Sequence, residues 1–291
     1  VTTGSNNVGV GRQALGAMTS GGNNVGIGWN AGLNITTAST NVAVGFNSLA
    51  DCVTGTSNTA VGANALADTT ASENAGFGNE SLRLNTSGQY NAAFGANSLK
   101  ANTTASNNSA LGYNALGANT TGSTNTAIGQ NSLTANTTGG FNTALGAESL
   151  EANTTAANNV AVGWRSQHNT TTGTQNVSVG TSALAQNTTA NNNTAVGHLA
   201  LTANTTGTAN VVVGSTALDA NTTGDSNVAI GHNSLSANTT ADNNTAVGRN
   251  SLRVNTTGVD NVAVGANVLD ANTTGRMNVG IGKDALGANT E

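Results

Sequence analysis

The three histidines are the residues of this chain best suited to bind a metal ion or transfer protons: His168, His198 and His232. A zinc site needs side chains that converge on one point, and general acid–base catalysis needs a second polar group within reach. His198 and His232 each follow the glycine of a 17-residue repeat, with one repeat between them, so stacked repeats would hold them about 10 Å apart. We interpret all three as surface histidines, and we predict no catalytic residue, no metal site, no cofactor and no enzymatic activity.

Four aromatic residues share the position directly after a repeat glycine: Trp29, Phe46, Tyr113 and Trp164. Exposed aromatic side chains often contact glycans or partner proteins, so these four are our candidate surface contacts. The alternative is that they cover neighbouring repeats or line a groove between subunits.

Two further features have structural interpretations. Asn-Thr-Thr recurs as an N-glycosylation acceptor pattern, but the most regular Asn of the repeat mostly lies outside it, so we favour a structural role for asparagine. Cys52 stands where most repeats have Asn, and we interpret it as a substituted surface or turn residue. A single cysteine cannot form an internal disulfide.

The elements that must position these residues follow a period of 17 residues, with one step of 16 between Gly62 and Gly78. Each of seventeen repeats has a Gly, counted here as position 0, and an Asn at −4. A fixed period of this size indicates one structural unit stacked many times. The −4 residues that we predict to form a structural Asn ladder are Asn41, Asn58, Asn74, Asn91, Asn108, Asn125, Asn142, Asn159, Asn176, Asn193, Asn210, Asn227, Asn244 and Asn261.

Each position of the repeat has its own composition. Position −2 is small except for Val212, −1 is large and apolar, +3 is Ala or Ser with one Val, and +4 is Leu in fifteen repeats. The stretch from −4 to 0 therefore predicts a short strand that ends at the Gly, and we place a second strand near Leu-x-Ala-Asn-Thr-Thr. Two short strands and two bends predict one coil of an all-β, parallel β-solenoid, with coils about 4.8 Å apart.

The Asn at −4 has a physical explanation. Identical amides stacked along an axis can hydrogen-bond to each other, because each has donors and acceptors. In the 16-residue repeat we place the missing residue before the pair Thr69 and Thr70, outside the strand. We expect the Asn ladder to run through this repeat unbroken.

The strand is restricted on both faces, because −2 stays small and −1 stays large while charges occur freely at +1. A strand restricted in this way is buried on both faces, and one thin coil has a single interior. We therefore predict that each coil packs against another copy of the chain around a threefold axis.

Composition excludes several classes of protein. Charged residues are 7% of the chain and the net charge is −5, so no basic patch is available for nucleic acid. No apolar run reaches the roughly 20 residues that span a bilayer. Because the chain begins and ends inside a repeat, we expect residues 1–291 to be a single array of about 17 repeats within a longer fibre protein.

Several repeats resemble a known family. The segments at 41–49 and 227–235 are similar to head repeats of trimeric autotransporter adhesins of the YadA type, and the longer segment at 125–139 is similar to repeats of phage tail fibres. The resemblance implies a homotrimer of left-handed parallel β-rolls in an extracellular fibre, on a cell surface or a virion. It implies an adhesin head or fibre shaft that presents or mediates binding to a host-cell or surface receptor, including glycans. Adhesin heads have shorter units than this repeat.

A second hypothesis comes from the Thr pair at +8 and +9. Stacked Thr residues make a regular, uncharged polar ladder, which suits an ice- or crystal-binding solenoid that uses Thr and Asn ladders. Adjacent strand residues point in opposite directions, so only one of the two Thr columns would be displayed.

Overall fold

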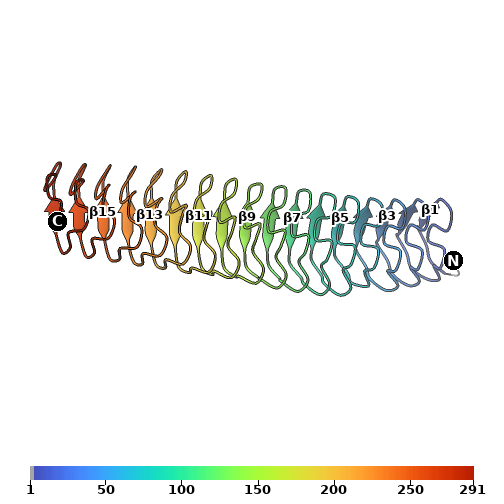
Figure 1. Ribbon diagram of the computed structural model, residues 1–291. Helices are drawn as coiled ribbons and strands as arrows, with labels where there is room; N and C mark the ends of the chain where they lie inside the picture. The colour runs from blue at the N-terminus through green and yellow to red at the C-terminus, as the bar shows by residue number, and fades with distance from the viewer. Residues whose placement is uncertain (1–2) are drawn as a thin grey trace. The chain divides into compact units, whose positions relative to one another are not determined.

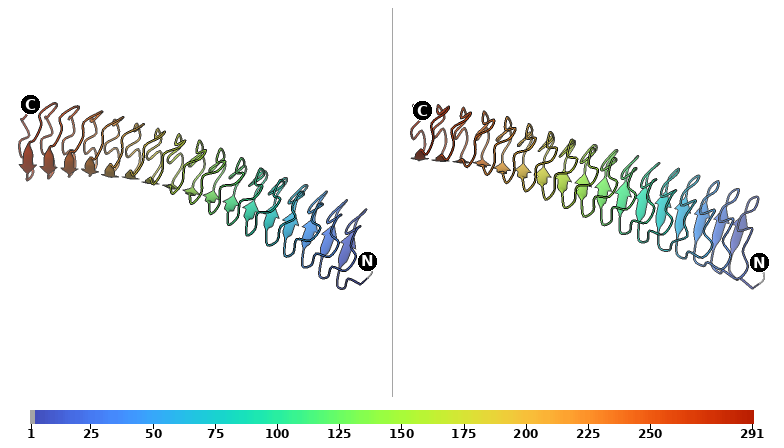
Figure 2. Two further views of the ribbon diagram at one scale, coloured as in Figure 1. Left: turned by 90° about the horizontal axis from the view of Figure 1, so that it is seen from below. Right: turned by 60° about the horizontal axis from the view of Figure 1, so that its bottom comes forward.

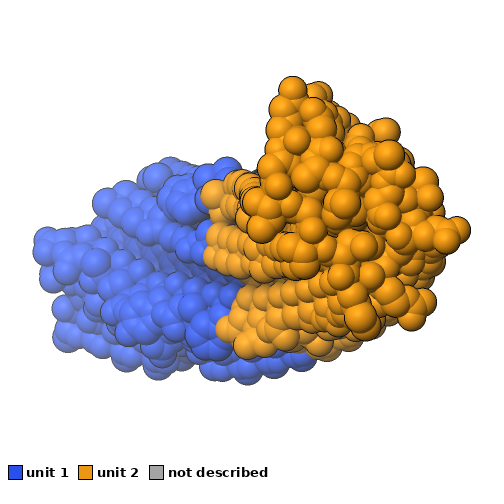
Figure 3. Space-filling view, turned by 90° about the vertical axis from the view of Figure 1, so that its left-hand side faces the viewer, with its two compact units in different colours: residues 1–142 blue, residues 143–291 orange. Residues whose placement is uncertain are grey.

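The computed structural model describes residues 3–291. The chain divides into two compact units, Val1–Asn142 and Thr143–Glu291 (Figure 3). In each unit, every repeat forms one coil with a three-residue strand (Figure 1). None of the described residues forms a helix that is long and apolar enough to cross a membrane.

The strands of each unit are parallel and stack in sequence order. Figure 2 shows successive strands of a unit at the same place in their coils. Unit 1 contains β1 (Val8–Val10), β2 (Val25–Ile27), β3 (Val42–Val44), β4 (Thr59–Val61), β5 (Ala75–Phe77), β6 (Ala92–Phe94), β7 (Ser109–Leu111) and β8 (Thr126–Ile128). Unit 2 contains β9 (Thr143–Leu145), β10 (Val160–Val162), β11 (Val177–Val179), β12 (Thr194–Val196), β13 (Val211–Val213), β14 (Val228–Ile230), β15 (Thr245–Val247), β16 (Val262–Val264) and β17 (Val279–Ile281).

The pairing register follows the repeat, so that each position lies beside the same position of the next coil. Ala43 pairs with Ala60, for example, and Val212 with Ala229. The predicted parallel β-solenoid is therefore confirmed for each unit.

The second strand that we predicted in each coil does not form. The stretch from +1 to +6 is a series of turns, in which +2 and +4 have positive φ. In a strand, neighbouring side chains point to opposite faces, whereas here +3 and +4, such as Ser98 and Leu99, are both buried. The left-handed residues let two adjacent side chains enter the core, and no sequence pattern of period 2 describes that.

The Leu at +4 is the largest buried side chain of most coils, and it adopts a left-handed conformation, with φ of 49° in Leu99 and 53° in Leu184. This conformation costs an ordinary L-residue about 1–2 kcal/mol. Burying a Leu side chain contributes about 1.5–3 kcal/mol. The core contact therefore offsets the backbone strain.

The Gly at position 0 is invariant for two reasons. Its φ is positive and extended, 130° in Gly45, a conformation that side chains rarely allow. A Cβ on Gly45 would also lie 2.6 Å from the carbonyl oxygen of Gly62 in the next coil. Close stacking at this corner therefore requires glycine.

The core of each unit is a column of small side chains at −2 facing the residues at +3 and +4. In β2–β17 the residue at −2 is buried. The residues at −3 and −1 are half-buried or exposed in every strand, as Ser109 and Leu111 of β7 are exposed. Within one chain, each strand is buried on one face, and the second face, which we predicted to be covered by another copy of the chain, lies open.

The 16-residue coil keeps its strand in register, with Thr59 opposite Ala75. The residue that it lacks follows Thr70 instead of preceding the Thr pair as we predicted. The backbone N–H of Thr70 donates to the Thr86 carbonyl, as the +8 residue does in other coils, and Ala71 already stands at +10. The missing residue is therefore the exposed Thr at +9.

Candidate functional site

The −4 asparagines form the predicted ladder, and the fourteen from Asn41 to Asn261 are at most 2% exposed. In Asn210, Nδ2 donates to Asn193 Oδ1 over 3.2 Å and to the Gly224 carbonyl over 2.9 Å. The backbone N–H of Asn227 in turn donates to Asn210 Oδ1 over 2.9 Å. The ladder crosses the 16-residue coil through the backbone N–H of Asn74, which donates to Asn58 Oδ1 over 3.0 Å, whereas Asn74 Nδ2 donates to the Ser72 and Gly88 carbonyls.

A second ladder of hydrogen-bonded asparagines lies at +7, and we did not predict it from the sequence. Asn102 Nδ2 donates to Asn85 Oδ1 over 2.8 Å and to the Ala105 carbonyl over 3.0 Å. Asn102 is the asparagine of an Asn-Thr-Thr triplet and Asn85 that of an Asn-Thr-Ser triplet, and both are fully buried. Because Nδ2 is the atom that glycosylation would modify, the folded solenoid shields it. The regular Asn-Thr-Thr was the available signal for this ladder.

Cys52 occupies the same +7 column, between Ile35 and Thr69, and it is fully buried. Our interpretation of Cys52 as a surface or turn residue was therefore wrong in placing it at the surface. Burial raises the pKa of the Cys52 thiol to about 11, against the smaller opposing effect of its hydrogen bond to the Gly55 carbonyl. A thiol in this state is a poor nucleophile.

The two Thr columns differ in exposure and in bonding. At +8 the hydroxyl donates to the +8 carbonyl of the next coil, as Thr205 Oγ1 does to Thr222 over 3.0 Å. At +9 the side chains, such as Thr206, are exposed. The displayed Thr column is thus at +9, outside any strand.

An apolar stripe runs along each unit on the open side of the strands. We call it the outer face: the side chains at −3 and −1 of β1–β8 in unit 1 and of β9–β17 in unit 2. Leu111 is 53% exposed and Ile128 is 42% exposed, and the Phe77 and Phe94 rings stack with centroids 4.8 Å apart. A hollow of about 220 Å³ on this face is lined by Ala92, Phe94, Ser109, Ala110, Leu111 and Ile128.

The four candidate aromatic residues at +1 are about half exposed, from 44% in Phe46 to 55% in Tyr113. Only two of them meet: the Trp29 and Phe46 rings contact edge to face with centroids 5.6 Å apart. The Arg12 guanidinium lies 5.4 Å from the Trp29 ring centroid, and Arg165 lies at the same distance from Trp164. Each tryptophan therefore pairs with a cation and still offers exposed ring surface.

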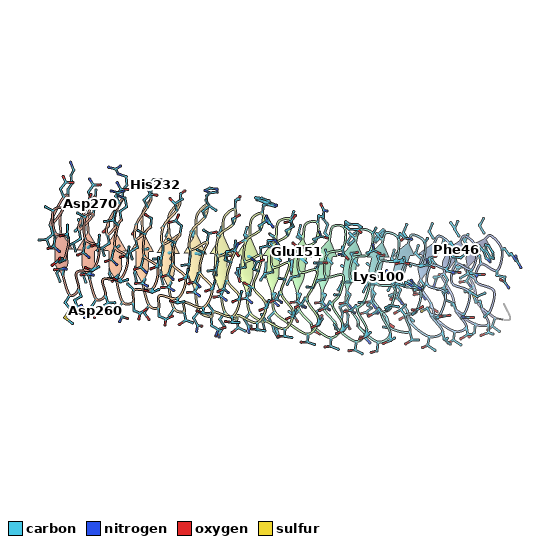
Figure 4. All side chains as sticks on the ribbon, viewed as in Figure 1. Phe46, Lys100, Glu151, His232, Asp260 and Asp270 are labelled. Carbon is cyan, nitrogen blue, oxygen red and sulfur yellow. The ribbon has the colours of Figure 1, made fainter. Side chains whose placement is uncertain are left out.

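The polar surface lies on the loops on either side of the strands. In the view of Figure 4, His232 and Asp270 lie above the strands of unit 2 and Asp260 lies below them. His198 and His232 are exposed, as we interpreted them, whereas His168 is half-buried.

His168 belongs to a charged cluster that our comparison of identical positions overlooked. The cluster lies at +2 and +5 of two adjacent coils and contains Glu148, Glu151, Arg165 and His168. The Arg165 guanidinium lies 2.7 Å from His168 Nε2 through Nη2, and its Nε is 3.0 Å from Glu148 Oε2. Burial, followed by the charge of Arg165, lowers the pKa of His168 below its ordinary value.

A scan against protein-family models, a search of curated proteins and a search of solved structures each found no match for this chain.

Proposed function

We propose that this chain is a structural and adhesive segment of an extracellular fibre, with no enzymatic activity, in which three copies of a left-handed β-roll pack through the outer face. One observation carries the proposal: every strand presents large apolar side chains at −1 to the solvent side of its coil. The fibre would stand on a cell surface or a virion, as an adhesin head or a tail-fibre shaft.

The extent of the outer face supports burial by a partner. Monomeric soluble proteins rarely expose contiguous apolar patches larger than a few hundred Å². In unit 1 alone the stripe follows eight strands, from Val8 to Ile128. An open stripe of this kind would cause aggregation, so the folded protein needs an occupant for it.

A second copy of the same chain is the occupant that fits the repeat. Each coil presents the same two positions at the same spacing, so parallel copies match one another coil by coil. Cyclic symmetry closes such an assembly without leaving a free face, and three copies would direct their stripes toward one axis. The +1 positions beside the stripe accept Arg12 and Lys283, which suits a solvated rim.

The experiment measures the mass of the purified chain by mass photometry or light scattering. We expect three times the chain mass of 28.4 kDa. Replacing Phe94 and Ile128 together by Lys should reduce the assembled fraction. The matched control places Lys at Ala96 and Gln130, two residues further along in the same coils, and should leave assembly intact. A stable, folded monomer of the unmodified chain would falsify the trimer.

Adhesion is proposed for the exposed aromatic residues at +1. The Trp29 and Phe46 pair offers a platform of the kind that binds sugar rings, with Arg12 beside it. Replacing Trp29 and Trp164 by Ala should weaken binding to cells or to glycan arrays while the assembly mass is unchanged. If binding is the same without both rings, these residues are not the contact surface.

The exposed Thr column at +9 supports a second candidate function, which is binding to ice or another crystal. Thr206 and Thr223 represent a column of exposed hydroxyl-bearing side chains that repeats once per coil. Thermal hysteresis that disappears when several +9 Thr residues are replaced by Lys would favour this function. A fibre segment should show no thermal hysteresis.

A further inference from the structure

We propose that Glu148, Glu151 and His168 form a binding site for a divalent transition-metal ion of borderline softness, with zinc as the representative. The three residues come from two adjacent coils of unit 2. Their ligand atoms all lie within 4.8 Å of one another, and all three side chains are half-buried. The site is independent of the proposed fibre function and lies apart from the outer face in the repeat.

The spacing inside the cluster is already near that of a metal site. His168 Nδ1 lies 3.5 Å from Glu151 Oε2. Two ligands of a tetrahedral zinc ion, each about 2.0–2.2 Å from the metal, lie about 3.4 Å apart. A metal between these two atoms therefore needs little movement of either side chain. Glu148 Oε2 lies 3.9 Å from the same imidazole at Nε2 and provides the third ligand after a side-chain rotation.

His168 Nδ1 is one of the two buried side-chain nitrogens of the cluster that make no hydrogen bond. The Glu151 carboxylate faces this nitrogen without bonding to it. A buried polar atom without a hydrogen bond destabilises the folded state. Coordination of a metal ion would satisfy this nitrogen and neutralise the two carboxylates at once.

Arg165 is the competing cation. A guanidinium can only donate, so the 2.7 Å contact makes His168 Nε2 an acceptor and puts the proton of the neutral imidazole on Nδ1. When the metal takes Nδ1, that proton moves to Nε2, and two N–H groups then face each other. The guanidinium must leave the imidazole, and it must also give up the Glu148 carboxylate that the metal uses. Removing Arg165 should therefore strengthen metal binding.

The donor set selects the kind of ion. One imidazole nitrogen and two carboxylates suit Zn²⁺, Ni²⁺ or Cu²⁺, whereas Mg²⁺ and Ca²⁺ prefer oxygen ligands alone. Three protein ligands also leave at least one position for water or an exogenous ligand.

The test is a Zn²⁺ titration of the full chain without a histidine tag, by calorimetry. We expect one saturable site per chain. His168→Ala and the isosteric Glu151→Gln should each weaken binding about tenfold or more, in line with the effect of perturbing a metal's ligand environment. Arg165→Gln should bind Zn²⁺ more tightly than the unmodified chain. His198→Ala removes an exposed histidine of the same unit and should change nothing.

Two further readouts distinguish this site from adventitious binding. With Cu²⁺, electron paramagnetic resonance should show a single coordinating nitrogen, which His168→Ala removes. In a Trp29→Phe background, Zn²⁺ should change the fluorescence of Trp164, because Arg165 lies 5.4 Å from its ring and moves when the metal binds. Equal Zn²⁺ binding by the unmodified chain and His168→Ala, no saturable binding, or equal affinity for Mg²⁺ would each overturn the proposal.

Discussion

Gln167 donates a hydrogen bond from Nε2 to Ser178 Oγ over 3.0 Å, inside the core of unit 2. Both residues depart from their columns: +4 is Leu in every other coil of this unit, and −2 is Ala, Val or Gly. Gln167 Nε2 also donates to the Val160 carbonyl over 2.9 Å, but Gln167 Oε1 is buried without a hydrogen bond. The hydrogen bond between Gln167 and Ser178 therefore satisfies only part of the buried polar groups of this pair.

The first prediction concerns this pair. Gln167→Leu combined with Ser178→Ala should stabilise the protein by about 1–3 kcal/mol, because it removes a buried oxygen that lacks a partner and restores the apolar column. Ser178→Ala alone should destabilise it, since Gln167 then loses an acceptor. Urea unfolding of the three proteins measures both effects, and a double variant less stable than the unmodified chain would contradict the prediction.

The second prediction concerns the −4 ladder. Asn210→Ala should cost on the order of 2–4 kcal/mol, because the Gly224 carbonyl and the Asn227 N–H both lose buried partners. Thr206→Ala, at an exposed position in the coil before it, is the control and should change the unfolding midpoint little. Equal midpoints for the two variants would show that the ladder does not contribute to stability.

The third prediction separates backbone strain from crowding at position 0. Gly45 and Gly282 both have positive φ, but a Cβ would clash with the next coil only at Gly45, and it meets nothing within 4 Å at Gly282. Gly282→Ala should cost about 1–3 kcal/mol from strain alone. Gly45→Ala should cost more and disturb the local stacking. Thermal melting and proteolysis of both variants test the order, and an equal loss would mean that strain alone explains the invariant Gly.

The fourth prediction concerns Cys52. At pH 8 the folded protein should resist alkylation by iodoacetamide, and the urea-unfolded chain should react. Folding raises the thiol pKa from 9.0 to about 11, which favours the neutral form. The contribution of the buried, neutral thiol to the free energy of unfolding is therefore complete below pH 9. It is lost as the pH rises through 11, because the unfolded chain releases the thiol proton first. Cys52→Ser has no ionisable thiol and should lose less stability between pH 9 and 11; rapid alkylation of the folded chain would contradict the burial.

The sequence was sufficient for those features that a single column expresses. Asn at −4, the alternation at −2 and −1, and Gly at 0 were enough to place the strand, its register and the first ladder. The second ladder was harder to recognise, because Met18, Ile35, Cys52 and Thr69 occupy its column in the first four coils.

Features that depend on conformation or on neighbouring columns could not be predicted in this way. Leucine has no preference for the left-handed region, so the turn at Leu99 gave no warning against a second strand. The cluster around His168 joins +2 and +5 of adjacent coils, and a comparison of identical positions does not bring Glu148 and His168 together. The first error arises because side-chain direction is set by backbone torsions that residue types only partly reveal, and the second because contacts between adjacent coils also join different positions of the repeat.

The short coil between Gly62 and Gly78 has a practical consequence. One residue is absent after Thr70, yet strand pairing and the Asn58–Asn74 bond are intact. The Thr corner therefore tolerates changes in chain length that the glycine corner, with its 2.6 Å approach at Gly45, does not. A foreign peptide inserted after a +8 Thr would be displayed at the coil chosen for it. The repeat would then serve as a scaffold in which the coil number sets the position of each inserted peptide.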